Sequence, residues 1–239
     1  MTAMRVIRTI LFAVGLAFVA APAGADDANP AASAYMQSLG SKAIHELTDP
    51  GVPQAERQAR FRALLDGHFD IPAIAKFTLG RYWRTATEEQ RTDFIQLFED
   101  FIVQSYSTRF AEYHGESFLV AGSNTDERGV TIVHSKIDMP SAEDVRVDWH
   151  LRPRDASFAI VDIVVEGVSM AVTQRSEFAS VIQSRGGVAG LLEALRAKNA
   201  QSADSSGAQS RRSTAPAVAL GASGLIPSFA SLASGESAH

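Results

Sequence analysis

Four segments between Glu116 and Val165 have the composition of β-strands and are separated by short polar turns. They are 116–122, 129–139, 144–151 and 157–165. Strands joined by such short turns pair antiparallel, because a parallel pair needs a crossover of about a dozen residues or more. In the third segment, "DVRVDWHL", apolar and polar residues alternate, which indicates one buried face and one solvent-exposed face. This stretch therefore predicts a four-stranded antiparallel meander.

Helical patterns lie on both sides of the predicted sheet. Asp70 is a suitable N-cap for a short helix, and "TEEQ" (87–90) is a capping box that opens the helix expected to be longest. The helices predicted before the sheet are 31–47, 56–69, 70–79 and 87–113; those after it follow Val172 and Gly187. The predicted fold is α+β, a curved four-stranded sheet with helices packed on one side.

The sequence offers more apolar surface than so thin a fold needs for its core. Ile160 to Val172 is apolar on both faces, and an aromatic stripe runs along the helix that begins at Thr87. Val147, Trp149 and Leu151 form the buried face of the third strand. An empty apolar cavity is destabilising and an apolar ligand removes that cost. We therefore expect an apolar cavity between the sheet and the helices.

The two ends of the chain differ from its middle. Residues 1–25 have a positive start, an apolar run from Ile10 to Ala21 and the small-residue site "AGA" (23–25), as in a cleavable signal peptide for export. Residues 201–239 are rich in Ser, Ala and Gly, which predicts a low-complexity disordered tail. An alternative is that "GLIPSF" (224–229) in this tail folds onto an apolar surface. One domain is expected over 26–200, outside the cytoplasm.

Charge and reactive residues exclude several functions. The formal net charge of −5 argues against a nucleic-acid partner, and the absence of cysteine excludes disulfides and thiolate chemistry. The six histidines show no metal-ligand spacing, so neither a metal nor a cofactor is expected. "GVSMA" (167–171) approaches G-x-S-x-G, but a nucleophile elbow belongs to a parallel α/β sheet. Ser169 as the nucleophile of a lipid esterase is therefore the weaker alternative, and no catalytic residue is predicted.

Three blocks of the sequence are specific enough to compare with known families. They are "FDIPAIAKFTLGRYWRTATEEQRTDF", "YSTRFAEYHGE" and "DIVVEGVSMAVTQRSEFASVIQSRGGVAGLLEALR". These blocks resemble the MlaC family, also called the toluene-tolerance family of periplasmic phospholipid-binding proteins, and the resemblance spans about 35–198. It implies a periplasmic carrier that shuttles phospholipid between an inner-membrane ABC transporter with an MCE-domain protein and an outer-membrane lipoprotein complex, which maintains outer-membrane lipid asymmetry. The hopanoid-associated HpnM branch and a purely protein-binding adaptor are alternatives. The long tail departs from the family's usual pattern.

The resemblance also suggests where the acyl chains would lie. Each apolar candidate has plain core packing as its alternative. The candidates for the pocket lining are Phe77, Tyr82, Trp83, Phe98, Phe101, Ile102, Tyr106, Val147, Trp149, Ile163, Val165, Val168, Met170 and Phe178. Arg81 and Arg84 flank the aromatic pair of "GRYWR" and are candidates for contact with a lipid phosphate or with acidic groups of a partner. Ordinary solvated arginines are the alternative there.

Overall fold

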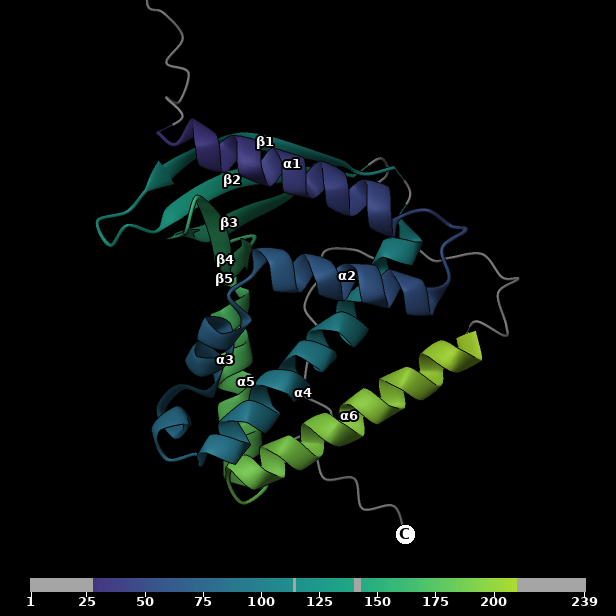
Figure 1. Cartoon of the computed structure of the whole chain (residues 1–239), viewed down its shortest axis with the longest axis vertical. Helices are drawn as coiled ribbons and strands as arrows, with labels where there is room; N and C mark the ends of the chain where they lie inside the picture. Colours follow the sequence, from purple (N-terminus) through teal and green to yellow (C-terminus); the bar gives the residue numbers. More distant parts are fainter. Residues whose placement is uncertain (1–27, 114, 140–142, 210–239) are drawn as a thin grey trace, which may run out of the picture.

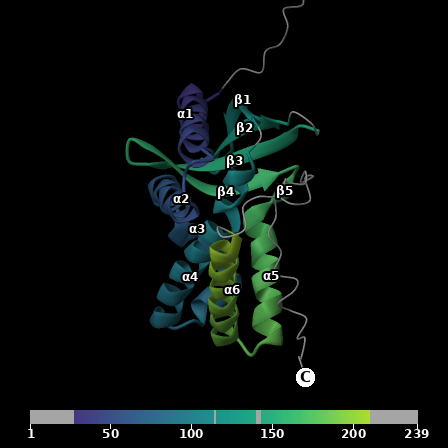
Figure 2. The same cartoon turned by 90° about the vertical axis from the view of Figure 1, so that its right-hand side faces the viewer.

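The computed structural model describes residues 28–113, 115–139 and 143–209 (Figure 1). The predicted signal peptide and the tail from residue 210 lie outside these ranges. The described chain contains an antiparallel sheet, two helices that cover one face of it, and a bundle of four helices beside it (Figures 1 and 2). The predicted α+β class and the antiparallel sheet are confirmed.

The sheet has five strands in the order of the sequence, one more than predicted. They are β1 (Ser117–Thr125), β2 (Thr131–Asp138), β3 (Val145–Arg154), β4 (Ser157–Val165) and β5 (Val168–Ser169). The extra strand exists because Glu166 and Gly167 both have positive φ, 48° and 79°, which makes a tight two-residue turn. The chain therefore reverses, and Val168 pairs with Val165. The expectation that the chain stays extended to Val172 is wrong, since the next helix begins at Met170.

Helices α1 (Pro30–Leu47) and α2 (Gln54–His68) cover one face of the sheet. Met36 of α1 is 1% exposed and belongs to one buried cluster with Val133, Leu151 and Ile160 of the strands. Helix α1 approaches β1 closely at Gly40, where a Cβ atom would lie 2.3 Å from the ring of Phe118. Glycine at this position lets the helix lie directly on the strand.

The remaining helices form a bundle. They are α3 (Ile71–Leu79), α4 (Glu88–Ser107), α5 (Met170–Ser184) and α6 (Val188–Gln209), with short 3₁₀ helices at Gly80–Arg84 (η1) and Arg109–Glu112 (η2). The capping box forms as predicted, with Thr87 and Gln90 each bonded to the other's backbone N–H. Helix α4 ends at Ser107, short of the predicted Tyr113, and η2 follows it. The longest described helix is instead α6, and it extends nine residues into the predicted tail, 201–239.

The buried residues form two separate cores. The bundle core contains Phe94, Phe98 and Phe178 from α4 and α5, and the sheet core contains residues of α1, α2 and β2 to β4. No buried residue of the described chain belongs to both clusters. The sequence predicted one helical layer against the sheet, but the helices divide into a pair that covers the sheet and a bundle with an interior of its own.

The two units are joined at the edge of β4. The backbone N–H of Asp70, just before α3, donates to the carbonyl of Ile160 at 2.9 Å. At the other end of β4, the turn and β5 lead directly into α5. Both ends of one strand therefore fix where the bundle begins relative to the sheet.

Candidate functional site

The apolar face of the sheet continues from the helix-covered region towards the bundle. The register places Trp149 opposite Ile163 and Val147 opposite Val165, and Val165 is paired in turn with Val168. These five side chains share the face on which α1 packs, because Trp149 and Ile163 also contact the sheet core. All five are among the predicted lining residues, and the structure brings them together on adjacent strands.

This apolar patch is only partly covered. Val147 is buried at 3% exposure, whereas Val168 is 46% exposed, and Trp149, Ile163 and Val165 are half-buried. A contiguous half-covered apolar surface beside a helix bundle is typical of a site that binds apolar groups. The five residues Val147, Trp149, Ile163, Val165 and Val168 are called the sheet patch below.

Hydrogen bonds hold the indole of Trp149 in place. Its Nε1–H donates to Ser135 Oγ at 2.9 Å, and that hydroxyl donates to the carbonyl of Val147 at 2.8 Å. The ring also packs edge-on against Phe118, with centroids 6.0 Å apart. Because the only polar atom of the indole is bonded within the sheet, its remaining surface is purely hydrocarbon in character.

The other predicted lining residues lie in or beside the bundle. Phe98, Phe101 and Phe178 are at most 3% exposed and fill the bundle core. Tyr82, Trp83 and Ile102 are half-buried and pack against that core. The structure therefore divides the fourteen predicted residues into the sheet patch and a bundle group, and the bundle group also includes Phe77, Tyr106 and Met170.

The end of α4 carries polar groups that the sequence analysis did not single out. Gln104 Oε1 and Arg109 Nε are buried and have no hydrogen-bond partner among the described residues. The guanidinium of Arg109 lies 5.9 Å from the ring centroid of Tyr106. Burial raises the pKa of the Tyr106 hydroxyl well above its usual value, so this phenol is neutral at any physiological pH. Nothing in the local sequence distinguishes Gln104 or Arg109 from solvated residues.

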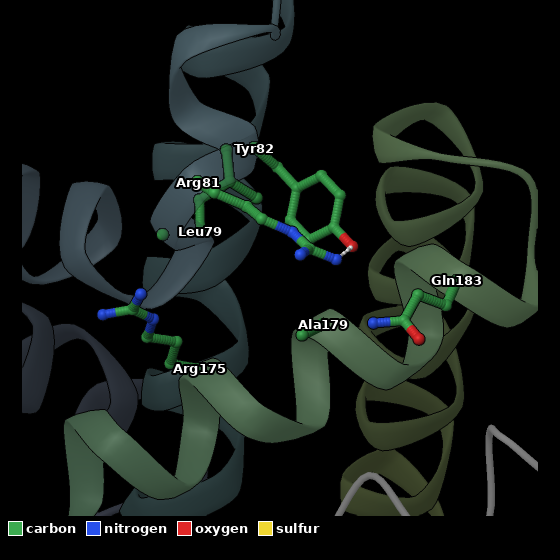
Figure 3. Close-up of a pocket in the computed structure, with 7 residues that line it drawn as sticks. Leu79, Arg81, Tyr82, Arg175, Ala179 and Gln183 are labelled. Atoms are coloured by element: carbon green, nitrogen blue, oxygen red, sulfur yellow. Dashed lines mark hydrogen bonds between the residues drawn. The ribbon is translucent and has the colours of Figure 1, made fainter.

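A groove of about 270 Å³ lies between η1 and α5 (Figure 3). Its lining residues are Leu79, Gly80, Arg81, Tyr82, Arg175, Ala179 and Gln183. Arg81 donates to the Tyr82 hydroxyl at 2.7 Å, and this bond lowers the pKa of Tyr82. Of the two arginines predicted to contact a headgroup or partner, Arg81 lines this groove and Arg84 does not. Sequence reasoning missed Arg175, which is far away in the chain.

Ser169 has a structural role at the start of α5. Its hydroxyl donates to the carboxylate of Asp162 and accepts the backbone N–H of Val172 at 3.1 Å, so it is the N-cap of the helix. Asp162 also accepts the N–H of Ala171 at 3.0 Å. The described partner of the hydroxyl is thus a carboxylate and not an imidazole base, and this geometry is that of a helix cap.

The described residues contain neither a cluster of metal-ligand side chains nor a helix suited to span a membrane. No set of three or more histidine, aspartate or glutamate side chains is placed to hold a metal ion within the described ranges. In the same part of the chain, no helix combines the length and apolarity needed to cross a bilayer.

Comparison with known proteins shows similarity to a protein family and to a solved structure. A family described as MlaC protein matches residues 37–197. The fold is similar to that of a phospholipid-binding protein from Ralstonia solanacearum, solved in complex with a phospholipid, with a TM-score of 0.63 and 23% sequence identity. The match covers 72% of this chain and 98% of the other. The family match includes all five strands, helices α3 to α5 and the residues that line the groove.

Proposed function

Because the chain belongs to the MlaC family, we propose that it is a lipid carrier that shields the acyl chains of a phospholipid between the sheet patch and the helix bundle. The observation that carries this proposal is the sheet patch itself, a row of aliphatic and aromatic side chains left half-covered where the sheet meets the bundle. The phospholipid bound by the protein of similar fold supports the same ligand class.

The energetics suit a carrier. Each buried CH₂ group gains about 0.8 kcal/mol relative to water, so two acyl chains are held firmly against release into solvent. A bilayer buries the same chains, and the net free energy of transfer between bilayer and protein is therefore small. Such a carrier can take up lipid and release it again, because neither step has a large unfavourable free energy. The direction of transport therefore has to come from its partners.

The location and partners in this proposal follow from the family. The carrier works in the periplasm after removal of the signal peptide. It takes or delivers lipid at an inner-membrane ABC transporter with an MCE-domain protein and at an outer-membrane lipoprotein complex. In this proposal it acts without turnover and without a cofactor. A carrier for hopanoid-type lipids has the same chemical requirement for an apolar site.

Native mass spectrometry of the exported protein, purified without detergent, tests the proposal. We expect a species heavier than the bare chain by the mass of a phospholipid, and extraction with organic solvent should release that lipid for identification. Protein that carries no lipid, and that takes up none when mixed with phospholipid vesicles, would contradict the carrier function.

The Ser169→Ala variant separates the carrier from an esterase. Loss of the N-cap should lower the free energy of unfolding by about 1 kcal/mol, measured by urea denaturation. Lipid loading should be unchanged, because the hydroxyl is bonded to Asp162 and Val172 and is not needed to hold a lipid. Thr173→Ala is a suitable control, since this hydroxyl lies on the same helix and bonds only to the carbonyl of Ser169 among the described residues. Lipid hydrolysis by the wild-type protein that disappears in Ser169→Ala would instead support the esterase.

A further inference from the structure

Arg81 and Arg175 are two cationic side chains that have no carboxylate partner among the described residues. Six other arginines form ion pairs with carboxylates in the described part of the chain, namely Arg60, Arg62, Arg91, Arg128, Arg146 and Arg196. No carboxylate of the described residues pairs with Arg81 or Arg175, although the protein is acidic overall, with a net charge of −5. Both line the groove between η1 and α5 (Figure 3).

Neighbouring residues hold both arginines in position. The guanidinium of Arg175 lies 5.3 Å from the ring centroid of Phe77 and against the backbone of Gly80. Gly80 has φ of 58°, and a Cβ atom there would lie 2.8 Å from Arg175 Nε, so any other residue would displace this side chain. Arg81 is oriented by its bond to Tyr82. Two guanidinium groups from different helices are thus retained at one groove.

Exposed apolar side chains lie near the groove and near the sheet patch. Val168 of the sheet patch and Val172 at the start of α5 are 46% and 51% exposed, and Phe77, which is 42% exposed, packs against Arg175. Two strand residues and five helical steps separate Val168 from Arg175, which amounts to at most about 14 Å along the chain. A lipid whose chains lie on the sheet patch would span this interval with its glycerol, its phosphate and the first carbons of its acyl chains.

We propose that Arg81 and Arg175 form a phosphate-binding site in the groove, which holds the phosphodiester of the lipid whose acyl chains lie on the sheet patch. Guanidinium groups match the oxygens of a phosphate with paired, charge-assisted hydrogen bonds, and they are more weakly hydrated than lysine. Leu79 and Ala179 contribute apolar surface to the lining of the groove. This assignment rests on the proposed carrier function. The group that the site recognises is a phosphate, so a free phosphate ion is an alternative ligand.

Short-chain ligands below their micelle-forming concentration test the site. Binding of dioctanoyl phosphatidylglycerol and of dioctanoylglycerol, which lacks the phosphate, is measured by calorimetry for the full exported chain. The wild type should bind the phospholipid at least tenfold more tightly, since charge-assisted hydrogen bonds are the strong ones. The double variant Arg81→Gln/Arg175→Gln should bind both ligands equally. Arg84→Gln, on the same 3₁₀ helix but outside the groove, should keep the wild-type preference.

Inorganic phosphate forms the second arm of the test. Binding of phosphate to the wild type but not to the double variant, without any preference for phospholipid, would support the site and assign it to the free ion. A double variant that keeps both the preference for phospholipid and any phosphate binding would overturn the proposal. If the wild type binds neither dioctanoyl ligand, the carrier function fails, and the phosphate arm still decides the site. Circular dichroism confirms that each variant is folded.

Discussion

Replacing Phe178 with alanine is expected to lower the free energy of unfolding by about 4 kcal/mol, the usual cost of removing a fully buried ring. Phe178 is 0% exposed and packs edge-on against two rings of α4, with centroid distances of 5.5 Å to Phe94 and 5.8 Å to Phe98. The lost ring leaves a cavity in the bundle core that these neighbours cannot fill. Because a domain is typically stable by only about 5–15 kcal/mol, this loss removes a large fraction of the stability, and the variant should unfold at a markedly lower denaturant concentration.

Phe77→Ala is the matched control for this change. Phe77 was also predicted to line the lipid pocket, but it is 42% exposed and lies under Arg175. Its removal should change the unfolding free energy by less than about 1 kcal/mol, because a partly exposed ring loses little buried area. Chemical denaturation of both variants gives the comparison. Equal losses would contradict the division of the predicted residues between a packed core and an accessible surface.

Val165→Gln should reduce lipid binding at least tenfold while the protein stays folded. Val165 lies in the sheet patch between Val147 and Val168, and it is half-buried. A glutamine there faces hydrocarbon whenever lipid is bound, and a buried amide without partners costs about 1–3 kcal/mol. The half-buried position makes this variant more informative than one at Val147, where the 3% exposure means that a polar group would also disturb the sheet itself.

Val164→Gln is the control for lipid binding. Val164 is the preceding residue of β4, is also half-buried, and points to the opposite face of the sheet. Its substitution should leave the quantity of co-purified phospholipid unchanged in native mass spectra. A similar loss of lipid in both variants would show that the effect comes from the strand and not from the sheet patch.

The sequence predicted those parts of the fold that depend on local interactions. The capping box of Thr87 and Gln90 is a bond pattern between residues three apart, and it forms as written. The alternation in "DVRVDWHL" set the two faces of β3, because side chains along a strand point in opposite directions. The antiparallel order follows from the short turns for the same local reason.

The features that the sequence did not reveal depend on distant parts of the chain. Periodicity shows that Phe98 and Phe178 are buried, but it does not show that they face one another in a core separate from the sheet. Val168 and Ser169 read as a continued strand because the positive φ of Glu166 is unusual for a residue other than glycine. Arg175 and Arg81 line the same groove because α5 packs beside η1, and no spacing in the sequence reveals this packing. Sequence reasoning therefore named the apolar residues of the candidate site and Arg81, and it missed Arg175.

The separation of the bundle core from the sheet core affects how the boundary between the sheet and the bundle responds to a bound lipid. Each buried cluster belongs to one unit, so a small rotation of the bundle about the connections at Asp70 and Met170 would keep both clusters. The rotation would strain the ion pairs of Arg62 on α2 with Glu99 and Asp100 on α4. Hinge and shear motions of this kind use a few residues at the ends of elements. We expect the distance between the sheet patch and the bundle to be larger when longer or kinked hydrocarbon is bound and smaller when no lipid is bound. One protein could then accept lipids of different volumes.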